Sequence, residues 1–507
     1  MSVCQKLTDV YIFVMLLIFP LFTGFRGYTQ ITDSKFFFLL SATLLWIVLL
    51  VVFSVLERKR EKGKNSLLPS LRPSELAALA FAAVCTVSAL VSPFFPETLP
   101  GAGRWDGLLT LLLYVLILLC ARRFGRLRAA HLYAAGVSLL FQTGIVLLQL
   151  LDRNPLGLFP GGLRWSDANL RYSGVFLGTI GNVDLLASYL CLFIPLFCGA
   201  YMLNARCWPL LTAASPAILL LLYSDTAAGP VSLLLAALPA MPFLLDSRCR
   251  LLRFCVVLSV ASFSCAVFAA IRFQAGTAVF QPSFLAAGLL CAALLCAAAA
   301  YLLHRRRACT DRSRRFYFRG VFFAELLLLV AALAVLWFWP GKSGTVHELH
   351  CVLRGDVRES FGSSRIRIWR EALALVPQRP LLGGGPGTIA NRLNINFERF
   401  VPETGQTLRS FVDNAHNVYL GLLTDTGALG LLAYLSIIGC SIAEILKRRR
   451  EPVRLLTGLA LLCGWIADFF GLGLCLTAPL LWLLWGLSGS TERPDAPEGS
   501  RRPAEPG

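Results

Sequence analysis

The chain has 507 residues, of which 56% are hydrophobic, and its mean hydropathy is +0.67. This composition excludes an ordinary soluble globular protein and a disordered one. The formal net charge of +18 would suit a nucleic-acid partner, but the basic residues cluster in alternate connections between apolar segments. That distribution favours membrane orientation and contact with membrane lipids, so we expect no nucleic-acid partner.

Apolar segments recur from one end of the chain to the other. They predict an all-α polytopic integral membrane protein with about fourteen transmembrane helices. The first segment is too long for a cleavable signal peptide and lacks a small-residue cleavage site, so we expect it to be retained. Very short connections near Ala227 and Gly471 leave the number of spans open by one or two. The predicted spans lie near residues 7–25, 36–56, 75–92, 106–121, 131–151, 183–203, 209–224, 228–245, 254–273, 281–303, 320–339, 416–446, 453–470 and 472–488.

The basic clusters set the predicted orientation, because short loops rich in Lys and Arg stay in the cytoplasm. They place both termini inside. The chain then divides into an N-terminal bundle of about eleven helices, a large extracytoplasmic loop with interfacial helices, C-terminal transmembrane helices, and a disordered cytoplasmic tail. The predicted boundaries are 1–339, 340–415, 416–488 and 489–507.

The predicted outer loop is far longer than the other connections, which indicates a structure or function of its own. It is rich in arginine, and so many outward guanidinium groups suggest an anionic partner. Four apolar residues at helical spacing suit a helix lying at the bilayer interface: Ile366, Trp369, Leu373 and Val376. The glycine-rich stretch at 380–387 lacks the Gly-Lys-Ser/Thr ending of a nucleotide-binding loop.

A single histidine, His416, stands where this loop gives way to an apolar helix. Its near-neutral pKa suits proton abstraction at a water–membrane boundary. A histidine at a helix end is also often a capping or packing residue, so position alone leaves both interpretations open. The pair His347 and His350 lacks a third ligand and the HExxH spacing, so we expect no metal site.

Four elements, in this order along the chain, resemble elements of the O-antigen ligases and related bacterial Wzy-type polymerases. Arg104-Trp105-Asp106-Gly107 is similar to an R-x-x-G element, and residues 178–190 to G-T-x-G-N-P-N-x-x-A-x-Y-L, with Val183-Asp184 where Pro-Asn is common. Residues 365–387 resemble R-x-x-x-W…P-L-L-G-x-G-x-G. The strongest element is His416-Asn417-x-Tyr419-Leu420 followed by Asp425-Thr426-Gly427-x-x-Gly430-Leu431.

The resemblance implies a membrane glycosyltransferase. It would move a saccharide from a polyprenyl diphosphate-linked donor to a glycan, lipid or protein acceptor on the outer face of a bacterial cytoplasmic membrane, without metal or other cofactor. His416 would be the general base. The spacing of Asp413, one turn before His416 if the helix begins early, suggests that Asp413 orients the ring. The diphosphate would be bound by Arg365, Arg367, Arg370 and Arg171, and the site would be supported by Asn417, Tyr419, Arg104 and Asn182.

A lipid-linked saccharide flippase or another polytopic transporter is the alternative, because it would show a similar number of spans. Transporters usually place ionisable groups at the membrane midplane on broken helices. Here the polar residues concentrate in one outer loop, which favours the enzyme. Ligase and polymerase would share these features, so the sequence leaves both open.

Overall fold

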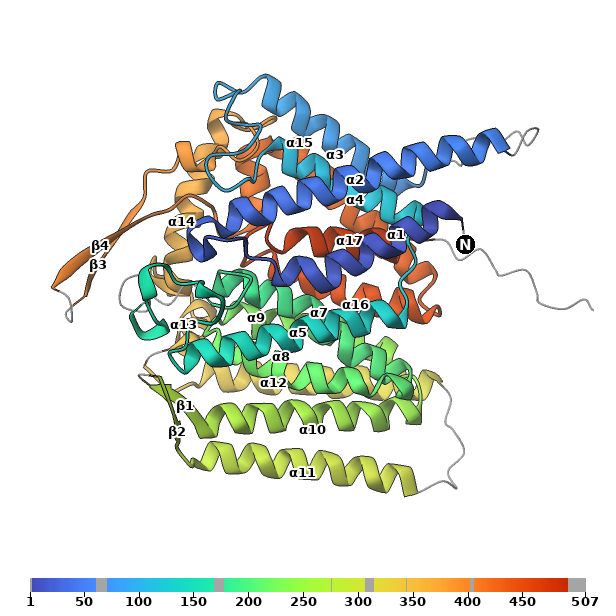
Figure 1. Cartoon of the computed structure of the whole chain (residues 1–507). Coiled ribbons are helices and arrows are strands. Elements are labelled where there is room, and N and C mark those ends of the chain that lie inside the picture. Colours follow the sequence, from blue (N-terminus) through green and yellow to red (C-terminus); the bar gives the residue numbers. More distant parts are fainter. Residues whose placement is uncertain are drawn as a thin grey trace, which may run out of the picture.

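Long apolar helices make up most of the protein, and they run side by side with their axes roughly aligned (Figure 1). The structure, a computed structural model, describes residues 2–60, 71–167, 177–274, 276–305, 314–342, 344–401 and 405–490. Arg171 and most of the predicted tail lie outside these residues.

Nine helical segments of the described chain are long and apolar enough to cross a membrane. In a bilayer the backbone groups of such helices pair with one another, because lipid tails offer no hydrogen-bond partners. The chain is therefore a multi-pass membrane protein. The helices in these segments are α1 (Val3–Phe13, continued by a π-helix and a 3-10 turn to Leu21), α2 (Ile31–Arg60), α3 (Pro73–Leu90), α5 (Ala129–Leu150), α7 (Val183–Leu203), α10 (Arg248–Ala270), α11 (Phe284–Arg305), α12 (Arg314–Trp337) and α15 (Val418–Lys447).

Shorter apolar helices fill the remaining predicted spans, so each predicted apolar segment contains a helix. They have 11 to 17 residues, and their length alone does not establish a crossing. The number of fourteen spans therefore stays a prediction. These helices are α4 (Leu108–Phe124), α8 (Pro209–Tyr223), α9 (Ala228–Leu244), α16 (Pro452–Ala467) and α17 (Ala478–Ser488).

The prediction of an all-α fold is wrong in two short places. Strands β1 (Ile271–Gln274) and β2 (Thr277–Phe280) form an antiparallel hairpin that joins α10 to α11. A second antiparallel hairpin pairs β3 (Asn396–Val401) with β4 (Gln406–Phe411). Both pairs carry β-branched or aromatic residues and turn near a glycine with positive φ, which favours strand pairing outside the apolar spans.

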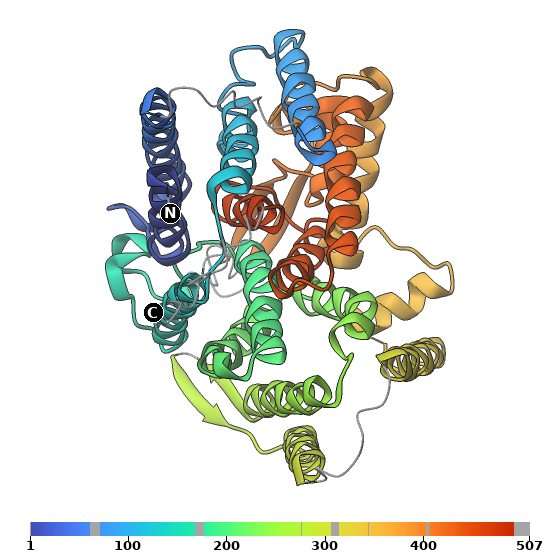
Figure 2. The same ribbon diagram turned by 90° about the vertical axis from the view of Figure 1, so that its right-hand side faces the viewer.

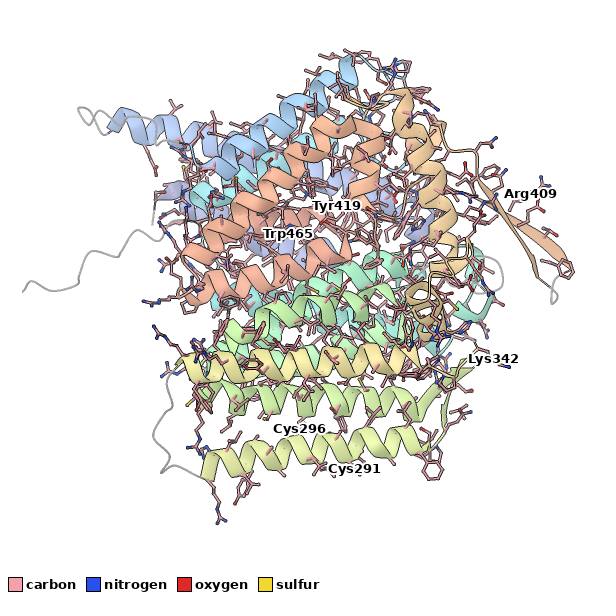
Figure 3. All side chains as sticks on the ribbon, turned by 180° about the vertical axis from the view of Figure 1, so that it is seen from behind. Cys291, Cys296, Lys342, Arg409, Tyr419 and Trp465 are labelled. Carbon is pink, nitrogen blue, oxygen red and sulfur yellow. The ribbon has the colours of Figure 1, made fainter. Side chains whose placement is uncertain are left out.

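The segment predicted as an outer loop is folded, and its elements gather at one end of the helix bundle (Figure 1). It contains α13 (Thr345–Leu353), α14 (Phe361–Leu375) and the β3–β4 hairpin, which projects away from the bundle and carries Arg409 (Figure 3). Helix α14 buries Ala372 in a cluster with Ile389, Ala415 and Leu420. This packing fixes α14 beside the start of α15.

Burial separates central from peripheral helices. In an 18-residue apolar stretch of α7, 78% of the residues are buried, whereas in the corresponding stretch of α12 none are. Helices α10, α11 and α12 lie at the rim of the bundle (Figure 2). Their exposed apolar side chains suit contact with lipid, and α7 is the central helix around which the others pack.

Helix α15 is interrupted at Gly427, where φ is +68° and ψ is −173°. That conformation is open essentially to glycine alone. The interruption deprives the carbonyls of Thr424 and Asp425, and the amides of Ala428 and Leu429, of their helical partners. Inside a membrane protein such groups must be satisfied by other protein groups.

The glycine-rich stretch 380–387 supplies those partners. Its amides donate to α15 carbonyls, and its carbonyls accept from α15 amides. The stretch is in turn held by α3 and the turn that follows it, because Ser88 of α3 donates to Leu382 O at 2.6 Å and Ser92, just after α3, donates to Gly384 O at 2.5 Å. The bonds to α15 are Gly384 N to Thr424 O (3.0 Å), Gly385 N to Asp425 O (2.8 Å), Ala428 N to Pro380 O (2.8 Å) and Leu429 N to Leu381 O (3.2 Å).

We expect Gly427→Ala to destabilise the protein strongly. The added Cβ would lie 2.2 Å from the Leu381 carbonyl carbon, and the backbone conformation alone costs a non-glycine residue about 1–3 kcal/mol. The measurement is thermal unfolding of purified protein in lipid nanodiscs. Gly421→Ala, in the same helix, meets nothing within 4 Å and should unfold no earlier than wild type. Equal melting of the two variants would contradict this account of the interruption.

Candidate functional site

His416 lies just before α15 in a backbone conformation that is uncommon for residues other than glycine. Its φ is +48°, in the left-handed region that costs a non-glycine residue about 1–2 kcal/mol. The backbone is fixed on both sides: Asn414 Oδ1 accepts from His416 N at 3.0 Å, and Asn417 caps the helix by accepting from Leu420 N at 3.0 Å. Such strain is typical of functional positions.

The imidazole of His416 is largely buried, with 29% of the side chain exposed. Its Nδ1 is buried without a hydrogen-bond partner among the described residues, and the nearest carboxylate oxygen, Asp184 Oδ2, is 4.0 Å away. Burial lowers the pKa of His416, and nearby Arg365 and Arg104 lower it too, while Asp184 and Asp413 oppose them. The ring is therefore neutral at neutral pH and able to accept a proton.

Arg365 reaches the same carboxylate from the other side. Its Nη2 lies 3.1 Å from Asp184 Oδ1, and both side chains are mostly buried. Arg365 follows three residues with positive φ, at 362–364, which turn the chain into the regular part of α14. Its Nε is buried and, within the described chain, has no hydrogen-bond partner. The structure thus brings His416 and Arg365 together around one acid from α7.

Arg104 and Asp413 form a second ion pair at this end of the bundle. Arg104 Nε lies 2.5 Å from Asp413 Oδ2, and about a third of each side chain is exposed. Trp105 anchors the turn that carries Arg104, because its Nε1 donates to Asp33 at 2.6 Å and its ring stacks on Phe36. Asp413 was predicted to orient the His416 ring, but the structure gives it Arg104 as its partner. Asp184 faces the ring instead.

Asn182 acts at the start of α7 rather than on the ring. Its Oδ1 accepts from Asp184 N at 2.8 Å and from Leu185 N at 3.3 Å, so it is the N-cap of the helix. The preceding turn is tied to α5, where Gln149 Oε1 accepts from Gly178 N and Gln142 Oε1 accepts from Thr179 N. These bonds hold Asp184 in a fixed place.

Other predicted site residues lie elsewhere. The Arg367 guanidinium stacks over Phe397 of the β3–β4 hairpin, 5.6 Å from the ring centroid. Arg370 is exposed and pairs with Glu359. Both residues follow Arg365 on α14 but point to other faces of the helix. The structure therefore does not bring them to His416.

Tyr419 points into the bundle, where its hydroxyl donates to Trp465 O at 2.6 Å (Figure 3). This contact fixes α15 against α16 and gives Tyr419 a structural place behind the site. Arg171 falls outside the described residues.

Sequence reasoning missed two buried carboxylates. Asp184 was noted only as a departure from the common Pro-Asn, although that departure was the signal that could have found it. Asp425 was quoted as part of a motif, but its partners come from the outer segment: Arg392 Nη2 at 2.6 Å and Gly387 N at 3.0 Å. Among the described residues no group of three or more His, Cys, Asp or Glu side chains converges as a metal site would require.

Residues 211–435 match the family model described as O-Antigen ligase, which confirms the resemblance to that family. The matched region contains both Arg365 and His416. A search of curated proteins found no match for the chain.

Proposed function

We propose that this chain, which carries an O-antigen ligase match over residues 211–435, is a membrane glycosyltransferase. It would move a saccharide from a polyprenyl diphosphate carrier to an acceptor hydroxyl at the outer face of the bacterial cytoplasmic membrane. One observation supports this most: Arg365 and His416, from separate segments, flank the same carboxylate at 3.1 and 4.0 Å. A phosphate-binding group thus lies beside a proton acceptor.

Arg365 would bind the diphosphate. Guanidinium groups grip phosphate oxygens through paired, charge-assisted hydrogen bonds. The buried Nε of Arg365, without a partner among the described residues, is a donor available to such an oxygen. Arg104, which is partly exposed, would add a second positive charge. Both charges would stabilise the departing diphosphate as the bond to the sugar breaks.

His416 would take the proton of the acceptor hydroxyl while that oxygen attacks the anomeric carbon. The bonding electrons of the old carbon–oxygen bond would leave with the diphosphate. Attack from the opposite side inverts the anomeric centre. In this scheme the arginines carry the charge of the leaving group, so neither a metal nor a nucleotide is needed.

A transporter is the alternative because α15 is interrupted, as transporter helices often are. The freed backbone groups in such transporters coordinate substrate or ions. In this protein they bond to residues 380–387 instead, and Asp425 is bonded to Arg392 and to Gly387 N. Because the polar groups at the interruption of α15 are already paired, the interruption is better explained as part of a fixed scaffold than as a transport site.

The proposed orientation predicts which ends of the bundle react from outside. A cysteine at exposed Thr345, the first residue of α13, should react with an impermeant thiol reagent in intact cells. A cysteine at exposed Arg449, after α15, should react only after permeabilisation. Labelling is read against the unsubstituted protein, because the chain has cysteines of its own. The reverse pattern would place the site in the cytoplasm.

We expect Arg365→Lys to lose most transfer activity, because an ammonium group keeps the charge but not the paired donors. Arg370→Lys is the matched control: it changes the same side chain one turn later on α14, where Arg370 pairs with Glu359. Transfer is measured with equal amounts of purified protein, together with lipid-linked donor and acceptor. If Arg365→Lys and Arg365→Ala both work normally, Arg365 does not bind the donor.

We expect His416→Ala to lower turnover by about two to four orders of magnitude, the usual effect of removing a general base. Donor binding should largely survive, because Arg365 and Arg104 stay in place. In wild type, activity should fall at acidic pH with an apparent pKa below the ordinary 6.5 of histidine, since burial favours the neutral ring. Wild-type transfer should persist in excess EDTA. Near-normal transfer by His416→Ala would refute the assignment.

A further inference from the structure

Asp184 stands between the two groups that the proposed function requires. Its Oδ1 is 3.1 Å from Arg365 Nη2, a hydrogen-bonding distance, while its Oδ2 is 4.0 Å from His416 Nδ1, too long for a hydrogen bond. Arg365 Nε and His416 Nδ1 are both buried without partners within the described chain. One carboxylate therefore faces two nitrogen groups and hydrogen-bonds to only one of them.

The position of the Asp184 carboxylate is fixed by the structure around the start of α7. Asp184 is in the first turn of α7, whose N-terminal dipole favours a negative charge. Asn182 caps that turn, and two glutamines of α5 bind the backbone before it. The two residues that face Asp184 lie in or next to irregular backbone. His416 has a φ of +48°, and three residues with positive φ precede Arg365.

Buried polar groups without partners are uncommon in folded proteins, and each calls for an explanation. For Arg365, a phosphate oxygen of the donor would supply the missing acceptor. That phosphate would compete with Asp184 for the guanidinium, because both are anions. Once released from Arg365, the carboxylate could accept a hydrogen bond from the Nδ1–H of His416, whose nitrogen lies 4.0 Å from Oδ2.

Resting on the proposed function, we infer that Asp184 couples donor binding to the readiness of His416. Without donor, Asp184 holds Arg365. With the diphosphate on Arg365, Asp184 accepts from Nδ1–H of His416, which leaves Nε2 as the proton acceptor for the hydroxyl. Asp184 is thus a positioning residue, and it keeps the base from being fully assembled until a donor is present.

The charged groups facing His416 come from four places: Asp184 on α7, Arg365 on α14, Arg104 before α4 and Asp413 before α15. Asp184 and Asp413 stabilise a positive ring, and the arginines destabilise it. Replacing Asp184 by a neutral residue would therefore lower the pKa of His416 further. The change would also remove a negative charge from beside the donor phosphate.

The test is Asp184→Asn in nanodiscs, with Asp184→Ser as a second variant that also suits a first helical turn. Turnover at saturating donor should fall at least about tenfold, because the ring tautomer is no longer fixed. Binding of undecaprenyl diphosphate should stay equal or tighten by about threefold or more, because the repulsion is gone. The acid limb of the pH–rate profile should move to lower pH. Asp246→Asn, which breaks an ion pair with Arg250 elsewhere, should change none of these.

A merely structural Asp184 would give lower abundance, weaker binding and an unmoved acid limb, and that pattern would overturn the inference. So would wild-type turnover in both Asp184 variants. In either event the proposed function stands or falls separately, on whether His416→Ala abolishes transfer. Slow turnover together with unweakened undecaprenyl diphosphate binding and a shifted acid limb supports the coupling.

Discussion

The hydrogen bonds between residues 380–387 and the interrupted helix α15 hold together the end of the protein that carries His416 and Arg365. A backbone break within an apolar helix must find protein partners, since lipid offers none. Here the partners come from the segment that follows α14. One set of bonds therefore fixes the start of α15, which His416 precedes, relative to α14, which carries Arg365. Ser88 of α3 and Ser92, just after that helix, secure the arrangement from the other side.

The ion pairs near that scaffold differ in how far their side chains are exposed to solvent. Arg392 with Asp425 lies deeper and is nearly enclosed, so it serves the scaffold. Arg104 with Asp413 is partly open to solvent. Arg365 with Asp184 lies between these extremes, and the Nε of Arg365 has no hydrogen-bond partner in the described part of the chain. The middle pair combines a buried setting, which strengthens electrostatic interactions, with a nitrogen that has no partner among the described residues, and its proposed role in binding an anionic substrate rests on these two features.

Sequence reasoning could find the residues that motifs mark, and it could not find how they pair. His416, Arg365, Arg104 and Asn182 were predicted and lie at one end of the bundle. Arg367 and Arg370 were predicted to bind the diphosphate together with Arg365. Residues two and five places apart on a helix point to different sides, and only the packing of α14 decides which side faces the site. Predicting Asp184 as part of the site required knowledge of a contact between α7 and α14, which are far apart along the chain.

The glycine-rich stretch shows the same limit. Its composition excluded a nucleotide loop, but composition alone could not reveal that its glycines allow the backbone to lie against α15. The helical spans were easier, because each depends on a continuous apolar run that can be read locally. The two hairpins were missed since their strands are short and lie at the margins of longer features.

The rim position of α10, α11 and α12 has a consequence for how this protein is held in shape. The apolar window of α12 buries no residue against the rest of the protein, so lipid tails are its main packing neighbours. Because lipid tails are as apolar as the side chains of α12, the hydrophobic effect does not hold this helix against the rest of the bundle. Helix α12 leads directly into α13 and α14. We therefore expect the thickness and lateral order of the bilayer to influence the position of α14 and of the Arg365 that it carries.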